Sequence, residues 1–111
     1  MAIYANINID QGTDFFSVIT VEGSDGNIFN LTGYSARGQV RKTYASNTAY
    51  DLATAINNPT SGLINISLSS TQTASMRPGS YVYDVEIVDA YNVVTRVVEG
   101  QVEVTPRVTR V

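Results

Sequence analysis

The segment from Pro78 to Asp89 constrains the fold of this chain most strongly, because it joins a turn to a regularly alternating strand. Pro78 presets the backbone for a turn, and Gly79 tolerates the positive φ that a type II turn requires next. Aromatic and aliphatic side chains then occupy one face, at Tyr81, Tyr83, Val85 and Ile87. The opposite face carries Val82, Asp84, Glu86 and Val88. This pattern predicts a β-strand that turns one face to a core and the other to solvent or a partner.

Similar strand-like segments recur along the chain, at residues 3–9, 15–22, 34–42, 63–69 and 93–104, and polar turns separate them. Residues 70–76 fit a short helical turn capped by Ser70, and residues 50–56 fit either a short strand or a helical turn. The whole predicts an all-β, immunoglobulin-like antiparallel β-sandwich of about seven strands with one short helical turn. We expect one domain over residues 1–111, with residues 105–111 as a short C-terminal tail.

Three local features predict details of the packing. Tyr81 follows the helical turn and the Pro-Gly turn, which is typical of a tyrosine corner, with its ring in the core and its hydroxyl bonded to nearby backbone. Ala36 and Gly38 are small inward-facing residues, so we expect Tyr81 or Tyr83 to pack over them. Gly100 interrupts the last strand and predicts a β-bulge. Residues 15–22 leave their buried face undecided, because both faces are apolar.

The composition argues against several kinds of chemistry. The chain has no Cys and no His. It therefore lacks the residues that most often bind zinc and iron–sulfur clusters, and the usual general base of a nucleophilic triad. Its net charge is −3, and its seven basic residues form no obvious patch for nucleic acid or for an anionic membrane. No apolar run approaches the roughly 20 residues of a membrane helix. We therefore expect no cofactor, metal, nucleic acid, membrane or small-molecule substrate.

The N-terminal segment lacks the basic start and the apolar stretch of a signal peptide. We accordingly expect the protein to be synthesised in the cytoplasm, and to reach the outside only within an assembly.

Two carboxylate pairs suggest specific sites and have simpler explanations. Asp10 and Asp14 flank Gly12 as in a calcium loop, but the Glu that closes an EF-hand loop is missing, which favours a plain polar turn. Asp84 and Glu86 have a separation near that of a glycosidase pair. A flat sheet face with arginines nearby would provide neither a cleft nor a raised carboxyl pKa, so we expect no catalytic residues.

The polar faces of two predicted strands form a candidate interaction surface. If these strands are neighbours, opposite charges face each other across the sheet, each pair contributing about 0.2–1 kcal/mol. The simpler interpretation of such a surface is a solvated face with ion pairs between its strands. The alternative is a subunit contact, which two valines beside the acids suggest. We call this surface the charged face; it comprises Arg37, Gln39, Arg41, Val82, Asp84, Glu86 and Val88.

The order of motifs over residues 31–42, 62–68, 78–86 and 94–104 resembles small tail and baseplate proteins of tailed bacteriophages and prophages. The nearest group is the N-terminal domain of phage baseplate upper proteins. The resemblance implies a virion structural protein that contacts other virion proteins and forms a homo-oligomer, with no catalytic residues. The first strand and the tail after Pro106 would be its docking segments.

An alternative is an immunoglobulin-like carbohydrate-binding or adhesion module. Such a module stacks sugars on exposed aromatic rings, for which Tyr44, Tyr50 and Tyr91 are the candidates. The chain has no Trp, the ring most useful for this purpose.

Overall fold

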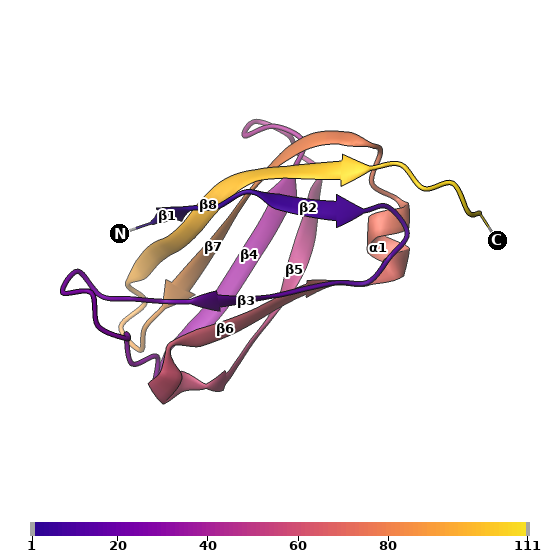
Figure 1. The fold of residues 1–111 in the computed structure, drawn as a ribbon. Helices are drawn as coiled ribbons and strands as arrows, with labels where there is room; N and C mark the ends of the chain where they lie inside the picture. The colour runs from indigo at the N-terminus through magenta and orange to yellow at the C-terminus, as the bar shows by residue number, and fades with distance from the viewer. Residues whose placement is uncertain (1, 111) are drawn as a thin grey trace.

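A computed structural model describes residues 2–110, which form an all-β fold with one short α-helix (Figure 1). The strands are β1 (Ile3–Tyr4), β2 (Ile7–Asp10), β3 (Phe15–Thr20), β4 (Ser35–Arg41), β5 (Ala49–Asn58), β6 (Leu63–Leu68), β7 (Gly79–Val88) and β8 (Val94–Thr105). A 3-10 helix, η1 (Pro59–Ser61), joins β5 to β6, and α1 (Ser70–Ala74) lies between β6 and β7. The all-β class is confirmed. No helix in the described part of the chain is long and apolar enough to cross a membrane.

The strands form a mixed sheet in the order β1-β8-β7-β4-β5-β6-β3, and β2 also pairs with β8. Both β1 and β2 run parallel to β8, whereas the other pairs are antiparallel. The expectation of an exclusively antiparallel arrangement is therefore wrong. Side chains alternate with period two in both kinds of pair, so the alternation that predicted the strands carries no information about their direction.

The sheet curls through β5, which pairs with two different strands along its length. The first part of β5 pairs with β4, from Ala49 to Leu52, and the next part pairs with β6, from Ala53 onward. The two ends of the sheet consequently turn toward each other, and the molecule resembles a half-barrel (Figure 1). The segment that fitted either a strand or a helical turn is thus a strand of ten residues.

The core fills the inside of this curl. Its fully buried side chains include Leu31, Ile64, Met76, Val85 and Val102. The small residue Gly38 lies under Leu52 and Val85, whose methyl groups would lie 3.0 and 3.1 Å from an added Cβ. The side chains closest to Gly38 are therefore Leu52 and Val85 rather than Tyr81 or Tyr83.

The N-terminal strand is interrupted at Ala5 and Asn6, although β1 and β2 keep one register along β8. The Asn6 side-chain Oδ1 accepts the Gln101 N–H, 3.1 Å away. The Ala5 carbonyl instead turns to the Tyr83 hydroxyl, which donates to it over 2.6 Å, and it lies directly over Gly100. Gly100 therefore makes room for a crossing backbone. The bulge in β8 lies opposite Val85 and Glu86 instead, so the prediction of a bulge at Gly100 is wrong.

Helix α1 is capped one residue earlier than expected, by Ser69 rather than Ser70. The Ser69 hydroxyl accepts the Gln72 N–H, and the Gln72 side chain accepts the Ser69 N–H, which together form a capping box.

One fully buried hydroxyl ties α1 to the turn between β2 and β3. The Thr73 hydroxyl accepts the Gly12 N–H over 3.0 Å and donates to the Thr13 carbonyl over 2.7 Å. We expect Thr73→Val to lower the free energy of unfolding by about 1–3 kcal/mol in urea denaturation, because it leaves two backbone groups unpaired. Thr73→Ser keeps the hydroxyl and serves as the control. Equal losses in the two variants would show that the hydrogen bonds contribute nothing.

Candidate interaction site

The charged face is assembled by the pairing of β4 with β7, which are neighbours as expected. The register places Arg37 opposite Glu86, Gln39 opposite Asp84, Arg41 opposite Val82 and Ser35 opposite Val88. Because directly opposed residues of a sheet point to the same side, all seven residues of the charged face lie on one surface. This surface is the one turned away from the core side chains Val40 and Val85.

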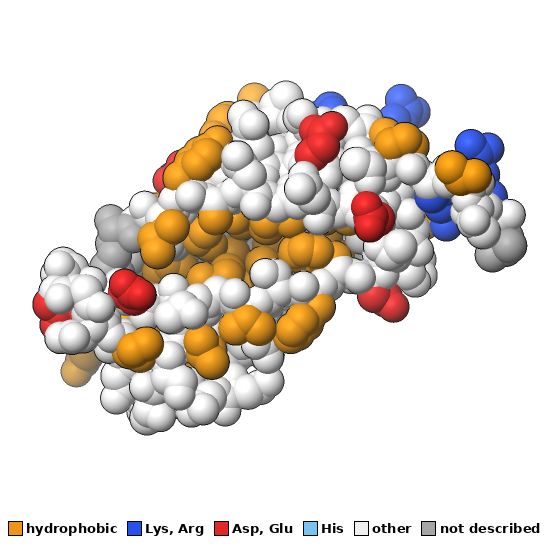
Figure 2. All heavy atoms as spheres, in the orientation of Figure 1, with side chains coloured by type: hydrophobic (Ala, Val, Ile, Leu, Met, Phe, Trp, Pro, Cys, Tyr) orange, Lys and Arg blue, Asp and Glu red, His pale blue; other side chains and the backbone are white. Residues whose placement is uncertain are grey.

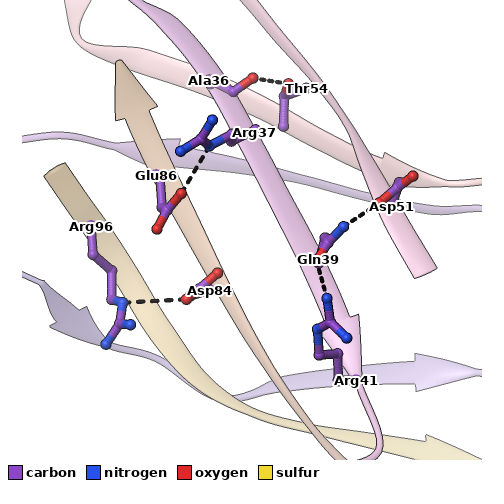
Figure 3. Close-up of polar contacts among 9 residues, drawn as sticks. All are labelled: Ala36, Arg37, Gln39, Arg41, Asp51, Thr54, Asp84, Glu86 and Arg96. Atoms are coloured by element: carbon purple, nitrogen blue, oxygen red, sulfur yellow. Dashed lines mark hydrogen bonds and ion pairs between the residues drawn. The ribbon is translucent and has the colours of Figure 1, made fainter. Parts of the chain in front are cut away.

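Ion pairs cross this surface between three strands (Figure 3). The Arg37 Nε lies 2.9 Å from the Glu86 Oε1, as the opposition of these two residues predicts. Asp84, however, pairs with Arg96 of β8, at 3.3 Å, rather than with an arginine of β4. Arg96 also reaches Glu99, at 3.4 Å. All these side chains are partly exposed, so each pair contributes little stability, about 0–1 kcal/mol.

Arg96 is a residue of this site that sequence reasoning missed. The bulge in β8 shifts its register, so that Glu86 lies opposite Arg96. An unbulged ladder that continued from the Val85–Val98 pair would have placed Val97 there. The sequence signal for this shift was the adjacent pair Val97 and Val98, because two neighbouring buried valines break the period-two alternation of a regular strand.

An amide links the remaining polar groups of the charged face. The Gln39 side chain donates to the Asp51 carboxylate over 2.8 Å and accepts from Arg41 over 2.9 Å (Figure 3). Arg41 also donates to the Ser46 carbonyl. The polar side chains of this surface are therefore bonded to each other or to backbone.

The surface is hollowed rather than flat. An open depression of about 670 Å³ lies over β4, β5, β7 and β8, lined by Arg37, Gln39, Arg41, Val82, Asp84, Glu86, Arg96, Glu99 and their neighbours. Partial burial raises the pKa of the Asp84 carboxyl, and the nearby Glu86 and Glu99 add to the effect, while Arg96 and Arg41 oppose it. The expectation of a flat face without a raised carboxyl pKa is wrong. The cause is Asp84's position in the hollow between β4 and β8.

The geometry of the two acids suits ion pairing better than proton transfer. Glycoside hydrolysis needs one carboxyl kept as an acid and another free as a base or nucleophile. Here Glu86 accepts from Arg37, and Asp84 faces Arg96.

We expect Asp84→Asn to change how stability depends on pH. A carboxyl whose pKa is raised in the folded state holds its proton more tightly there, so wild-type stability falls as pH rises through the window between the ordinary value near 3.8 and the raised value. The asparagine variant lacks this loss of stability. In parallel urea titrations, its free energy of unfolding relative to the wild type should therefore increase between about pH 4 and neutral pH. A difference that stays constant, or that reverses, would contradict the raised pKa.

The carboxylates of Asp10 and Asp14 accept hydrogen bonds from different partners. Asp10 accepts from the Thr105 hydroxyl over 2.9 Å, and Asp14 accepts the Ser70 N–H over 2.7 Å. Within residues 2–110 no group of three or more acids forms a metal-binding cluster. The observed contacts are those of a polar turn that fixes the strands around it.

The three candidate tyrosines do not form one stacking surface. Tyr44 and Tyr91 are 83% and 87% exposed, but they follow β4 and β7, which are antiparallel, and so lie toward opposite ends of the sheet. The Tyr50 ring packs edge-on against Tyr81 at 6.3 Å, and its hydroxyl donates to the Ser75 carbonyl.

A second surface with binding character lies along β3. Phe16 and Val18 of this strand are 64% and 46% exposed. Figure 2 shows hydrophobic side chains on the floor of a hollow between β3 and the β2–β8 side of the molecule, with others on the rim. The sequence signal for this surface was the apolar character of both faces of residues 15–22.

The comparisons with known proteins place this chain in no family. No protein-family profile matches it, and no curated protein does. Among solved structures it is similar to the Listeria monocytogenes internalin-like protein lmo2027, with a TM-score of 0.48 and 17% sequence identity over 96% of this chain. The chain spans 28% of the length of that protein.

Proposed function

We propose that this chain is a non-catalytic structural module of a tailed phage or prophage particle, in the tail, baseplate or neck, where it assembles with other virion proteins and with itself. The observation that carries the proposal is the edge strand β3. Between Asp14 and Glu22 it has apolar residues on both faces and neither a charge nor a proline. Monomeric proteins protect sheet edges with charges, prolines or bulges, so an unprotected apolar edge suits a protein partner.

Two features support an immunoglobulin-like module as the finer description of the fold. The Tyr81 ring is buried, and its hydroxyl donates to the Arg77 carbonyl four residues upstream over 2.8 Å, which is the geometry of a tyrosine corner. The chain reverses through β5 from one set of paired strands to the other, so that β3 and β6 lie across the core from β7 and β8. The order of motifs along the chain resembles that of baseplate proteins, and this resemblance supports a role in the virion.

The proposal is tested on intact particles. Virions or induced prophage particles from the strain that encodes the chain are purified on a density gradient, and their peptides are identified by mass spectrometry. We expect peptides of this chain to co-sediment with tail proteins in constant ratio, and to remain after a high-salt wash. Their absence from particles that contain the other tail proteins would overturn the proposal. The control is an abundant host protein of similar mass, whose amount in the purified particles measures contamination by host protein.

The second candidate is a carbohydrate-binding or adhesion module, which the exposure of Tyr44 and Tyr91 favours. A glycan array tests it directly. Binding that is lost in Tyr44→Ala or Tyr91→Ala would support it, whereas silence across the array would count against it.

A further inference from the structure

We infer that the open edge of β3 pairs with β3 of a second copy of the chain, antiparallel and about a two-fold axis that passes beside Ser17. The inference rests on the proposed assembly function and specifies one of its contacts: the partner is a second copy, the segment is Phe15–Ile19, and the register is fixed.

The first observation is that one edge of β3 is open. Strand β3 ends the sheet, and among residues 2–110 it pairs only with β6. Its other edge borders the hollow with the hydrophobic floor (Figure 2). An open edge presents backbone N–H and C=O groups that another strand can pair with.

The second observation is that the sequence of β3 is complementary to itself. Two aromatic residues, Phe15 and Phe16, precede Ser17, and two β-branched residues, Val18 and Ile19, follow it. When the strand pairs antiparallel with its own copy about Ser17, Phe15 meets Ile19 of the second copy and Phe16 meets its Val18. These pairs occur twice by symmetry, and each aromatic–β-branched pair contributes roughly 0.2–1 kcal/mol.

Both faces of the joined sheet benefit from this register. Phe16 and Val18 lie on the outer face, where they are now exposed. Phe15 and Ile19 lie on the inner face, packed only partly against the core. A two-fold axis perpendicular to the sheet keeps each face with its counterpart, so one contact covers apolar surface on both sides.

Charge selects among the registers that keep the faces aligned. Centring the pair on Val18 would place Asp14 directly opposite Glu22 of the second copy, and like charges in that position are unfavourable. Centring it on Ser17 places Asp14 opposite Thr20 instead. The two acids that flank the strand therefore disfavour this register, which is one of the two nearest alternatives.

Cysteine cross-linking tests the register, because the chain has no cysteine of its own. Directly opposed residues of antiparallel strands have Cα atoms about 4.5–5.5 Å apart, within reach of a disulfide. We expect S17C to form a covalent dimer under mild oxidation. The matched control is T20C, whose two copies would be about 20 Å apart, six residues at roughly 3.3 Å each. Mixing F16C with V18C should give the mixed dimer, with little product from either alone.

Sedimentation tests the contact without cysteines. We expect the wild type to dimerise reversibly, and V18K to raise the dimer Kd at least tenfold by placing a charge on the edge. The matched control is V94K, because Val94 of β8 is also a strand valine that is 46% exposed. It should dimerise like the wild type. Circular dichroism checks that each variant is folded.

The outcomes separate this inference from the proposed function. A wild type that stays monomeric at millimolar concentration, or a V18C dimer without an S17C dimer, overturns the inference. If the chain is nevertheless present in purified particles, the virion role stands. If the S17C dimer forms and the chain is absent from particles, the edge contact stands and the virion role fails.

Discussion

Replacing Tyr81 with alanine is expected to lower the free energy of unfolding by about 3–5 kcal/mol, the range measured for buried aromatic residues. The Tyr81 side chain is buried, packs edge-on against Tyr50 and lies under the Lys42 ammonium, which is 4.7 Å from the ring centroid. Truncation removes all these contacts and leaves a cavity at the start of β7. Urea denaturation followed by circular dichroism measures the change.

A second variant separates the ring from the hydroxyl. Tyr81→Phe keeps the ring and removes only the donor to the Arg77 carbonyl, so we expect a loss of about 1–2 kcal/mol. Tyr91→Ala is the control, because that ring is exposed, and it should change stability by no more than about 0.5 kcal/mol. If Tyr81→Ala lowers the free energy of unfolding by less than about 1 kcal/mol, the Tyr81 ring does not contribute to the core as proposed.

Replacing Gly100 with alanine is expected to detach the N-terminal strand at a cost of about 2–3 kcal/mol, as overpacking of a tight contact does. An added Cβ would overlap the Ala5 carbonyl oxygen and lie 2.8 Å from the Ala5 carbonyl carbon. Both are backbone atoms, so the crossing segment itself must move. Its movement breaks the hydrogen bonds from the Tyr83 hydroxyl to the Ala5 carbonyl and from the Ala5 N–H to Glu99.

Hydrogen exchange locates this effect along the chain. In Gly100→Ala, amide protection should fall for Ala5 and β2, while the β4–β7 pairs keep theirs. Gly33→Ala is the control, since an added Cβ there meets nothing within 4 Å and suffers only the strain of a positive φ, about 1–2 kcal/mol. Unchanged protection of β2 in the position 100 variant would show that Ala5 does not need the glycine.

Much of the fold could be predicted because local alternation identifies strands. The segments that became β4, β6, β7 and β8 were placed within a residue or two at each end. The parallel pairing of β1 and β2 could not be predicted, because strand direction depends on contacts between residues more than 90 positions apart. The crossing at Ala5 was missed for the same reason, since the residues that explain it, Tyr83 and Gly100, are distant in sequence.

In the candidate site too, local features could be predicted from the sequence and long-range features could not. The members of the charged face could be listed from two strands, because each strand fixes which of its residues share a side. The hollow over that face depends on the curl through β5, which leaves no local signal. The role of Arg96 depends on a register shift in β8, whose local signal is only the adjacent buried valines Val97 and Val98. Thr73 likewise looks like any other residue of a Ser- and Thr-rich segment until the turn that it holds is brought beside it.

The parallel pairing of β2 with β8 determines how the domain bears tension. The chain before β1 and the chain after β8 leave this pair at opposite ends, as Figure 1 shows. A pulling force applied between these points acts along the strands and loads the hydrogen bonds between them together, in shear, rather than opening them one after another. The parallel direction of β2 and β8 therefore favours resistance to extension over strand-by-strand opening.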